Sequence, residues 1–492
     1  MSAPSTPVNP GAEQTVRTRR SVLAGGVAGA LGATVLAPAG ADAQVLPPDD
    51  RYVWRSRMPV NVKDKGARGD GLTTPTDDTA AIQSAINDVA ATGGGTVFFP
   101  PGDYVVNGGL TIPAEKPIRL LGSGATLNSN GTVPWPTRLI RKSGSTTVIS
   151  AIGSGTNRVW FELSDLEVRG GGTAGNLVDV QIGNTCQFHR VNFAGTVGIG
   201  LRMRNVYNSS GSHLRWHSCG NGAGSPACLF DAVNASPGGS DTVLWDKLQF
   251  EGNSGTDLKL TGNASNDAGT VTTEIQMSQI KMEGGNPAAA NCPYIDLDYS
   301  QNCKFSDVEI TVHGGRTVPP LRKAHPFGGT RADKFVNLTI DNTQGDNFPY
   351  GIDHSKGALQ LENVTILGPA TAAIKVNSTV GASEFQLGKL VTNVARPVID
   401  SRGAIPTVSA AATINPPRER LVGVSGSSGS ITSISAHESG FMMTLKFAGG
   451  PTVAGGGNLH LANGANFVTT ADDMITLISD GTGWFEVSRT VL

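Results

Sequence analysis

The chain has 492 residues, of which 64 are glycine, 16% are charged and only 6% are aromatic. A formal net charge of -2, with no basic run after the first 43 residues, speaks against nucleic-acid binding. Because 38% of the residues are apolar, the chain can form a packed core, and the abundance of glycine with little charge is typical of an all-β protein with many turns.

The first 43 residues contain the three parts of an export signal. Thr18–Leu23 includes the pair Arg19-Arg20, an apolar run extends to about Leu36, and Ala41-Asp42-Ala43 offers a small-residue cleavage site. This order predicts a twin-arginine signal peptide over residues 1–43, so we expect a secreted or periplasmic protein that begins at Gln44. No later run is long enough for a membrane span. We interpret residues 44–59 as a linker or N-terminal arm.

A short helix is predicted near the start of the mature chain, between two strands. Asp77-Asp78 precede apolar residues at 82, 85, 86 and 89, a spacing that indicates a capped amphipathic helix. Gly93–Gly95 ends this helix, and Thr96–Phe99 begins a buried strand. We interpret the acidic and glycine residues of this region as turn and capping chemistry rather than as a metal or phosphate site.

A four-residue phrase that alternates polar and apolar residues then returns every 25 to 32 residues. Alternation predicts a half-buried strand, and its recurrence predicts a solenoid, because one such unit cannot bury its apolar side alone. We therefore predict an all-β parallel β-helix over residues 60–415, with the N-terminal helix as its cap. The phrases are Asp165–Val168, Arg190–Phe193, Arg215–Ser218, Lys247–Phe250, Gln279–Met282, Asp307–Ile310, Asn337–Ile340, Asn363–Ile366 and Lys389–Thr392.

The repeat fades after about residue 400, and Pro416-Pro417 marks a boundary. Short apolar phrases such as Met442–Phe447 and Met474–Ile478, separated by Gly, Asn and Asp, predict a small β-sandwich-like module over residues 416–492. Trimerisation, glycan attachment and simple stabilisation are the three roles that remain open for it.

Five cysteines offer no metal-binding spacing. Cys219 with Cys228 and Cys292 with Cys303 have spacings compatible with disulfides in an oxidising compartment, and burial as free thiols is the alternative. The sequence does not decide between these alternatives, and no pairing is assigned to these four cysteines or to Cys186.

The opening of the mature chain resembles the pectate-lyase-like superfamily. The resemblance rests on D-x-G-A-x-G-D-G, D-D-T-A-A-I-Q-x-A-I and G-G-G-T-V-x-F-P-P-G-x-Y, and it covers roughly residues 60–125. It implies a right-handed β-helix and a function among polysaccharide lyases, polygalacturonases, β-1,3-glucanases and phage tailspikes. The ending Asp480–Val487 resembles the C-terminal β modules of phage tail fibres.

The repeat also predicts which side chains face outward. The second and fourth residues of each phrase are apolar and face inward, so the third residue and the one after the phrase form an outer polar ladder. A polyanionic glycan can lie along such a ladder. The catalytic candidates are His217, Glu251, Lys281, Glu283 and Glu309, and the substrate-binding candidates are His313 and, in the nearby loop, Arg316, Arg322, Lys323 and His325.

Two mechanisms fit these residue types. β-Elimination from a uronic-acid polymer needs a base such as Lys281 or His217, with the sugar carboxylate neutralised by basic side chains or by calcium. Hydrolysis needs two carboxyl groups, which Glu251 could form with Glu283 or, at longer range, with Glu309. The structural alternative is that these residues form cross-strand ion pairs of small stabilising effect.

The chain also departs from the family's patterns. It lacks the G-H-G and R-x-K of polygalacturonases, and Gly351–His354 resembles the W-I-D-H of pectate lyases without the expected calcium-binding carboxylates around it. No catalytic residue is therefore carried over from either family. We expect a secreted polysaccharide-degrading enzyme, foremost a lyase of an acidic glycan. We expect no required cofactor, and calcium is the one candidate. The alternatives are a glycoside hydrolase of the polygalacturonase or glucanase type, and a non-catalytic tailspike-like adhesion protein, which could be a homotrimer.

Overall fold

The computed structural model describes residues 58–491 except 72–74, 125–135, 223, 233–238, 263–270, 285, 314, 325–330, 343–344, 370, 395, 402–406 and 417–419. The predicted signal peptide and nearly all of the predicted arm lie outside the described residues. Strands dominate the described part, in which α1 (Thr79–Ala91) is the one α-helix. No helix in this part is both long enough and apolar enough to cross a membrane.

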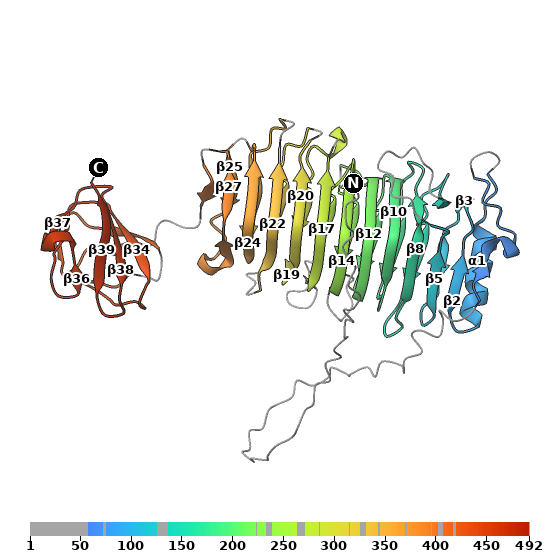
Figure 1. Cartoon of the computed structure of the whole chain (residues 1–492), viewed down its shortest axis with the longest axis horizontal. Coiled ribbons are helices and arrows are strands. Elements are labelled where there is room, and N and C mark those ends of the chain that lie inside the picture. The colour runs from blue at the N-terminus through green and yellow to red at the C-terminus, as the bar shows by residue number, and fades with distance from the viewer. Residues whose placement is uncertain are drawn as a thin grey trace, which may run out of the picture. The chain divides into compact units, whose positions relative to one another are not determined.

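Two long parallel sheets form a solenoid, and Figure 1 shows the strands of one of them side by side along it. Sheet A, as we call the larger one, has fifteen strands and contains the longest strands of the solenoid. Its strands are β1 (Val60–Asn61), β2 (Gly95–Phe98), β3 (Gly102–Val105), β5 (Pro117–Leu121), β6 (Thr137–Ile140), β8 (Trp160–Arg169), β10 (Gln187–Thr196), β12 (Tyr207–Cys219), β14 (Asp241–Glu251), β17 (Ile275–Glu283), β20 (Lys304–Thr311), β22 (Asp333–Asp341), β24 (Leu359–Leu367), β26 (Phe385–Leu387) and β27 (Leu390–Thr392).

Sheet B receives one short strand from each turn, and its neighbours also pair in parallel. Two further short strands, β16 (Thr272–Thr273) and β19 (Ser300–Gln301), pair with each other in parallel. Parallel stacks of this kind confirm the predicted β-helix. The strands of sheet B are β4 (Leu110–Ile112), β7 (Ile149–Ile152), β9 (Val178–Gln181), β11 (Leu201–Arg204), β13 (Cys228–Asp231), β15 (Leu258–Leu260), β18 (Ile295–Leu297), β21 (Leu321–Ala324), β23 (Tyr350–Lys356), β25 (Ala372–Val376) and β28 (Val398–Asp400).

A left-handed residue bends each long strand of sheet A. Trp245 and Leu248 are both buried although they stand three apart, because Lys247 between them has a φ of 56° and turns the strand through a corner. The corner gives sheet A two outer faces, one before it and one after it. The corner residues are Asp165, Arg190, His213, Lys247, Gln279, Asp307, Asn337 and Asn363, all with φ between 50° and 59°.

The structure corrects the third repeat by two residues. Leu214 pairs with Leu248 and Trp216 with Phe250, so the corner residue there is His213 rather than Arg215. Alternation alone fits both assignments, because Leu214 and Trp216 are both apolar and two apart. As a consequence Arg215 takes the outward position that the sequence analysis gave to His217.

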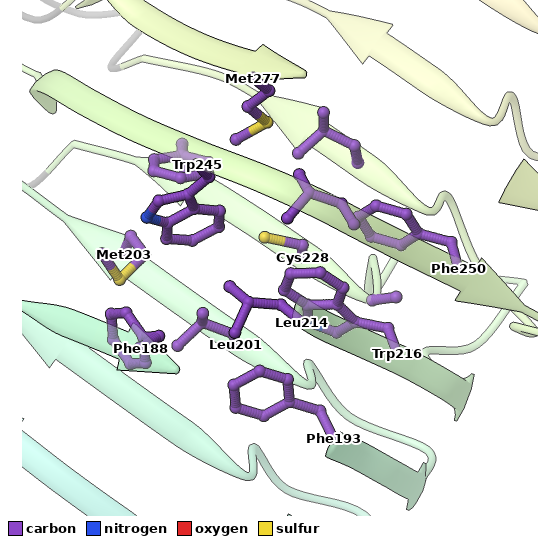
Figure 2. Close-up of a cluster of buried hydrophobic side chains, with 14 of the residues drawn as sticks. Phe188, Phe193, Leu201, Met203, Leu214, Trp216, Cys228, Trp245, Phe250 and Met277 are labelled. Atoms are coloured by element: carbon purple, nitrogen blue, oxygen red, sulfur yellow. The ribbon is translucent and has the colours of Figure 1, made fainter. Parts of the chain in front are cut away.

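The interior is filled by the side chains that were predicted to face inward. Leu248, Phe250, Ile280 and Met282 are all at most 2% exposed. Trp216 stacks on Phe250 with ring centroids 4.5 Å apart, and Figure 2 shows such side chains from successive strands meeting inside the solenoid. The five cysteines are free and buried. Neither pair considered above is bridged.

Helix α1 packs its apolar side onto the first strands of the solenoid (Figure 1). Ile82, Ala85 and Ile86 are fully buried there. The expected cap differs in detail, because Asp77 rather than Asp78 accepts the N–H of Thr79, at 3.0 Å. The buried Asp78 instead accepts the N–H groups of Arg68 and Gly69 and holds the glycine-rich loop.

The corner residues form a hydrogen-bonded ladder on the C-terminal turns. Asn363 donates to Asn337 at 2.7 Å, and Asn337 donates to Asp307 at 2.8 Å. Asn337→Ala is expected to lower the free energy of unfolding by about 2 kcal/mol, since it loses a hydrogen bond and strains a left-handed position. Chemical denaturation followed by circular dichroism measures this loss. The outward Thr339→Ala, two residues along, should cost less than about 0.5 kcal/mol, and equal losses would contradict the prediction.

The C-terminal module has its own apolar core, which includes Leu445, Leu477 and Trp484. Its main sheet mixes parallel and antiparallel pairs. The six strands are β29 (Thr407–Ser409), β31 (Leu421–Ser425), β34 (Met442–Phe447), β38 (Met474–Ser479), β39 (Trp484–Thr490) and β36 (Leu459–His460). Smaller sheets contain β30 (Thr413–Ile414), β33 (Ser433–Ile434), β32 (Ser430–Ile431), β35 (Thr452–Val453) and β37 (Phe467–Val468).

Candidate functional site

A groove lies on the outside of sheet A, across β12, β14 and β17. We call it the sheet-A groove, and its volume is about 370 Å³. It combines residues of the corner with outward residues that follow the corner, which is why polar and cationic side chains gather there. Its lining residues are His213, Leu214, Arg215, Lys247, Leu248, Gln249, Gln279 and Lys281.

The groove has a cationic character. The side chains of Lys247 and Lys281 are about half exposed, at 48% and 50%. Arg215 is buried, and its Nη2 donates to Glu251 Oε2 at 2.6 Å. Arg215 was missed by the sequence analysis because of the two-residue slip described above. The groove therefore presents two accessible lysines above a guanidinium that is already held by a carboxylate.

His217 lies beside Glu251 on the neighbouring strand, where the two residues pair in register. Burial lowers the pKa of His217 below its usual 6.5, the nearby Arg215 lowers it further, and Glu251 partly opposes them. Its Nδ1 is 3.2 Å from the hydroxyl oxygen of Ser218. The imidazole is thus held neutral at neutral pH, which is the form that can accept a proton.

The other predicted acids lie on the next strands. Glu283 Oε2 is 3.4 Å from Lys281 Nζ, and its Oε1 is 3.7 Å from His313 Nε2. Glu309 pairs in register with Lys281 and is exposed. The structure therefore brings all five predicted catalytic residues onto the four neighbouring strands β12, β14, β17 and β20. Among the described residues, no group of three or more His, Cys, Asp or Glu side chains is arranged to hold a metal ion.

The predicted substrate-binding residues do not share one place. His313 lies beside Glu283, whereas Arg316 and Lys323 are buried and so cannot face a glycan as expected. Arg316 packs on the ring of Tyr294, and Lys323 Nζ is 2.7 Å from the buried Asp333. Burial of both cations is possible because each has an acidic partner, which sequence spacing does not reveal. His325 lies outside the described residues.

Arg322 lies on strand β21 rather than in a loop, and it belongs to a charged row on sheet B. It donates to Asp296 at 2.8 and 2.7 Å, and Lys259 Nζ approaches the same carboxylate at 3.5 Å. Burial raises the pKa of the nearby Asp298, and Asp296 adds to this rise. The alternation I-D-L-D at residues 295–298 is the sequence signal that could have found this row.

The N-terminal turns of the solenoid match a known protein family. Residues 59–134 match the family described as "Rhamnogalacturonase A/epimerase, pectate lyase-like". The first turns of the solenoid are therefore similar to this pectate-lyase-like family. This result agrees with the motifs that opened the mature chain and with the parallel stacks described above.

Local matches connect the chain to enzymes of Azotobacter vinelandii. It is 41% identical over 122 residues to the mannuronan C5-epimerase AlgE1, a match that spans 23% of this chain but only 8% of that protein. It is 58% identical over 52 residues to alginate lyase 7, spanning 11% of this chain and 6% of the lyase. The A-module of the epimerase AlgE4 is a solved structure with 16% identity and a TM-score of 0.41, covering 70% of this chain and all of the module (100%).

Proposed function

We propose that the chain is a secreted enzyme that binds a uronic-acid-containing polysaccharide in the sheet-A groove and cleaves it by β-elimination. The observation that carries the proposal is the position of His217, two residues after the groove-lining Arg215, beside a groove whose accessible charges are Lys247 and Lys281. Burial lowers the pKa of His217. The names of two relatives, an epimerase of mannuronan and an alginate lyase, support a uronate as the substrate. Both reactions begin by removing the proton at C5 of a uronate.

Each side chain of the site has a separate role in this reaction. Lys281 and Lys247 bind the sugar carboxylate and offset its negative charge, which makes the C5 proton more acidic. His217 accepts that proton, and Glu251 beside it favours the imidazolium that forms. The electron pair of the C5–H bond becomes the C4–C5 double bond, the bond from C4 to the glycosidic oxygen breaks, and that oxygen takes a proton from water. Return of a proton to the other face of C5 would give the epimer instead.

The test is an assay of the chain from Gln44 on mannuronan, alginate and polygalacturonate in deuterated water, with calcium or with EDTA. A lyase produces the ultraviolet absorbance of an unsaturated uronate together with new reducing ends. An epimerase incorporates deuterium at C5 without new ends. Binding of these polymers with neither signal would overturn the enzymatic proposal and favour a glycan-binding adhesion protein.

One observation favours hydrolysis as a second candidate function. Asp298, directly after β18 of sheet B, has a raised pKa and can hold a proton, and Arg322 and Lys259 lie near it for an acidic sugar. Asp231 ends β13, two strands away, at a separation of roughly 9–10 Å, close to that of inverting glycosidases. Reducing ends without unsaturated product, abolished by Asp298→Asn but retained in His217→Gln, would establish this alternative.

A further inference from the structure

The direction of the groove determines how a polymer can bind in it. It crosses β12, β14 and β17, so its length follows the axis of the solenoid. Adjacent parallel strands stand ~4.8 Å apart, a distance comparable with the length of one pyranose residue. A uronate chain lying along the groove therefore places about one sugar over each strand.

Two rows of side chains run along the groove, and both change from basic or neutral residues to an acidic residue at the same strand. The corner row runs from His213 through Lys247 and Gln279 to Asp307, and the row after the corner runs from Arg215 through Gln249 and Lys281 to Glu309. Both rows become acidic at β20. The next strand, β22, is uncharged in both rows, with Asn337 and Thr339.

The acidic end of the groove differs from the other end in accessibility. On β8, Asp165 and Glu167 are buried beneath Arg190 and Arg169, whose side chains are 50% and 41% exposed. On β20, Glu309 is exposed, and among the described residues no ion pair or hydrogen bond of its carboxylate is found. A polyanion approaching β8 thus meets guanidinium groups, whereas one approaching β20 meets a bare carboxylate.

We infer that the series of uronate-binding positions along the sheet-A groove, which we call the track, ends at β20 because of Glu309, assisted by Asp307. The position over this strand therefore takes an uncharged sugar or the end of the polymer. Two like charges a few ångströms apart in water repel enough to weaken binding about five- to tenfold. Lys281, directly beside Glu309 in register, then binds the last uronate of the track. The inference rests on the proposed function only in taking a uronate polymer as the occupant of the groove.

A length series of oligouronates tests this end stop, with binding measured by calorimetry on the His217→Gln variant so that the ligand is not consumed. Affinity should rise with each added sugar and then level off when the track is full. Glu309→Gln should extend the rise by one sugar and strengthen binding of the longer oligomers about five- to tenfold, with the shortest unchanged. Neutral oligosaccharides of the same lengths should not respond.

Glu362→Gln is the matched control, because it makes the same chemical change on β24, where Glu362 faces Lys334 instead of the groove. An equal gain in this control, or an unchanged length dependence in Glu309→Gln, would overturn the end stop while leaving binding in the groove intact. If oligouronates do not bind at all, or if Lys281→Ala does not weaken their binding, the site named in the proposed function fails, and the end stop fails with it.

Discussion

Glutamine in place of His217 is expected to lower kcat on a uronate polymer by about 10²–10⁴-fold, the usual contribution of a general base. Glutamine keeps a polar side chain of similar reach but cannot accept the C5 proton. KM should change little, because the lysines that bind the carboxylate remain. His460→Gln in the C-terminal module is the control and should retain the activity of the unaltered chain. A loss of less than about threefold in His217→Gln would exclude it as the base.

The pH profile gives an independent test of the same role. The reaction needs the neutral imidazole, so kcat/KM should fall as the pH drops through the pKa of His217. Burial and Arg215 place this pKa below 6.5, so the acid limb is expected below that value. Glu251 raises the pKa of His217, and Glu251→Gln should therefore move the limb to still lower pH. A limb that stays in place in this variant would contradict the pairing of the two residues.

Much of the fold follows from the sequence because the repeat is a physical requirement of the solenoid. A four-residue phrase with apolar second and fourth residues fixes which side of sheet A is buried, and this interpretation holds for Leu248, Phe250, Ile280 and Met282. It fails by two residues at the third repeat, where Leu214 and Trp216 offer two equivalent registers. Only the pairing with β14, a contact between residues 34 apart such as Leu214 and Leu248, decides between them.

The candidate site is harder to predict from the sequence than the fold is. The five catalytic candidates come together because all lie in sheet A, whose register the repeat encodes. Arg316 follows a longer connection between sheets, and its burial depends on Asp257, 59 positions earlier in the chain, which no local pattern links to it. The short strands of sheet B have three to seven residues, so the alternation that contains Asp296 is hard to distinguish from chance.

The charges of the two sheets differ in a way that bears on function. On sheet B, Arg322 and Lys259 converge on one carboxylate, Asp296, which is almost completely buried. On sheet A, Lys281 lies 3.4 Å from Glu283 and Lys247 lies 3.8 Å from Asp246, and these two carboxylates are themselves partly exposed. An anionic ligand gains more from cations in long, exposed ion pairs than from cations that, like Arg322, already donate two short hydrogen bonds to a buried carboxylate. This difference is why we place the uronate in the sheet-A groove.

Arg316 ties together three successive connections from sheet A to sheet B. Its Nη2 is 3.5 Å from Asp257 Oδ2, its Nη1 donates to the carbonyl of Cys292 at 2.6 Å, and its guanidinium lies 3.9 Å from the centre of the Tyr294 ring. Arg316 and Asp257 are both almost completely buried. Burial raises the pKa of Asp257 to about 6, from 3.8, although Arg316 opposes the rise. The pair therefore couples the packing of these turns to pH.

Arg316→Met is expected to cost about 3–5 kcal/mol of stability at about pH 8, because it leaves an ionised carboxylate buried without its partner. The cost should be smaller at about pH 5, where the folded state keeps Asp257 protonated and uncharged. The sign follows from the raised pKa: between about pH 4 and 6 the folded chain holds a proton that the unfolded chain releases. Denaturant unfolding at both pH values measures this difference in stability. The control is Arg202→Met, which breaks a more exposed ion pair with Asp231 and should cost about 1 kcal/mol or less at both pH values.

The double variant Asp257→Asn/Arg316→Met separates the charge from the packing. Removing both charges should recover much of the stability lost at about pH 8, because no buried carboxylate remains unpaired. The stability of the unaltered chain relative to Asp257→Asn should also fall by about 2–3 kcal/mol as the pH rises from about 4 to 6. If Arg316→Met costs the same at both pH values and the double variant recovers nothing, Arg316 stabilises the turns through its contact with Tyr294 and the carbonyl groups, and the charge of Asp257 has no part in it.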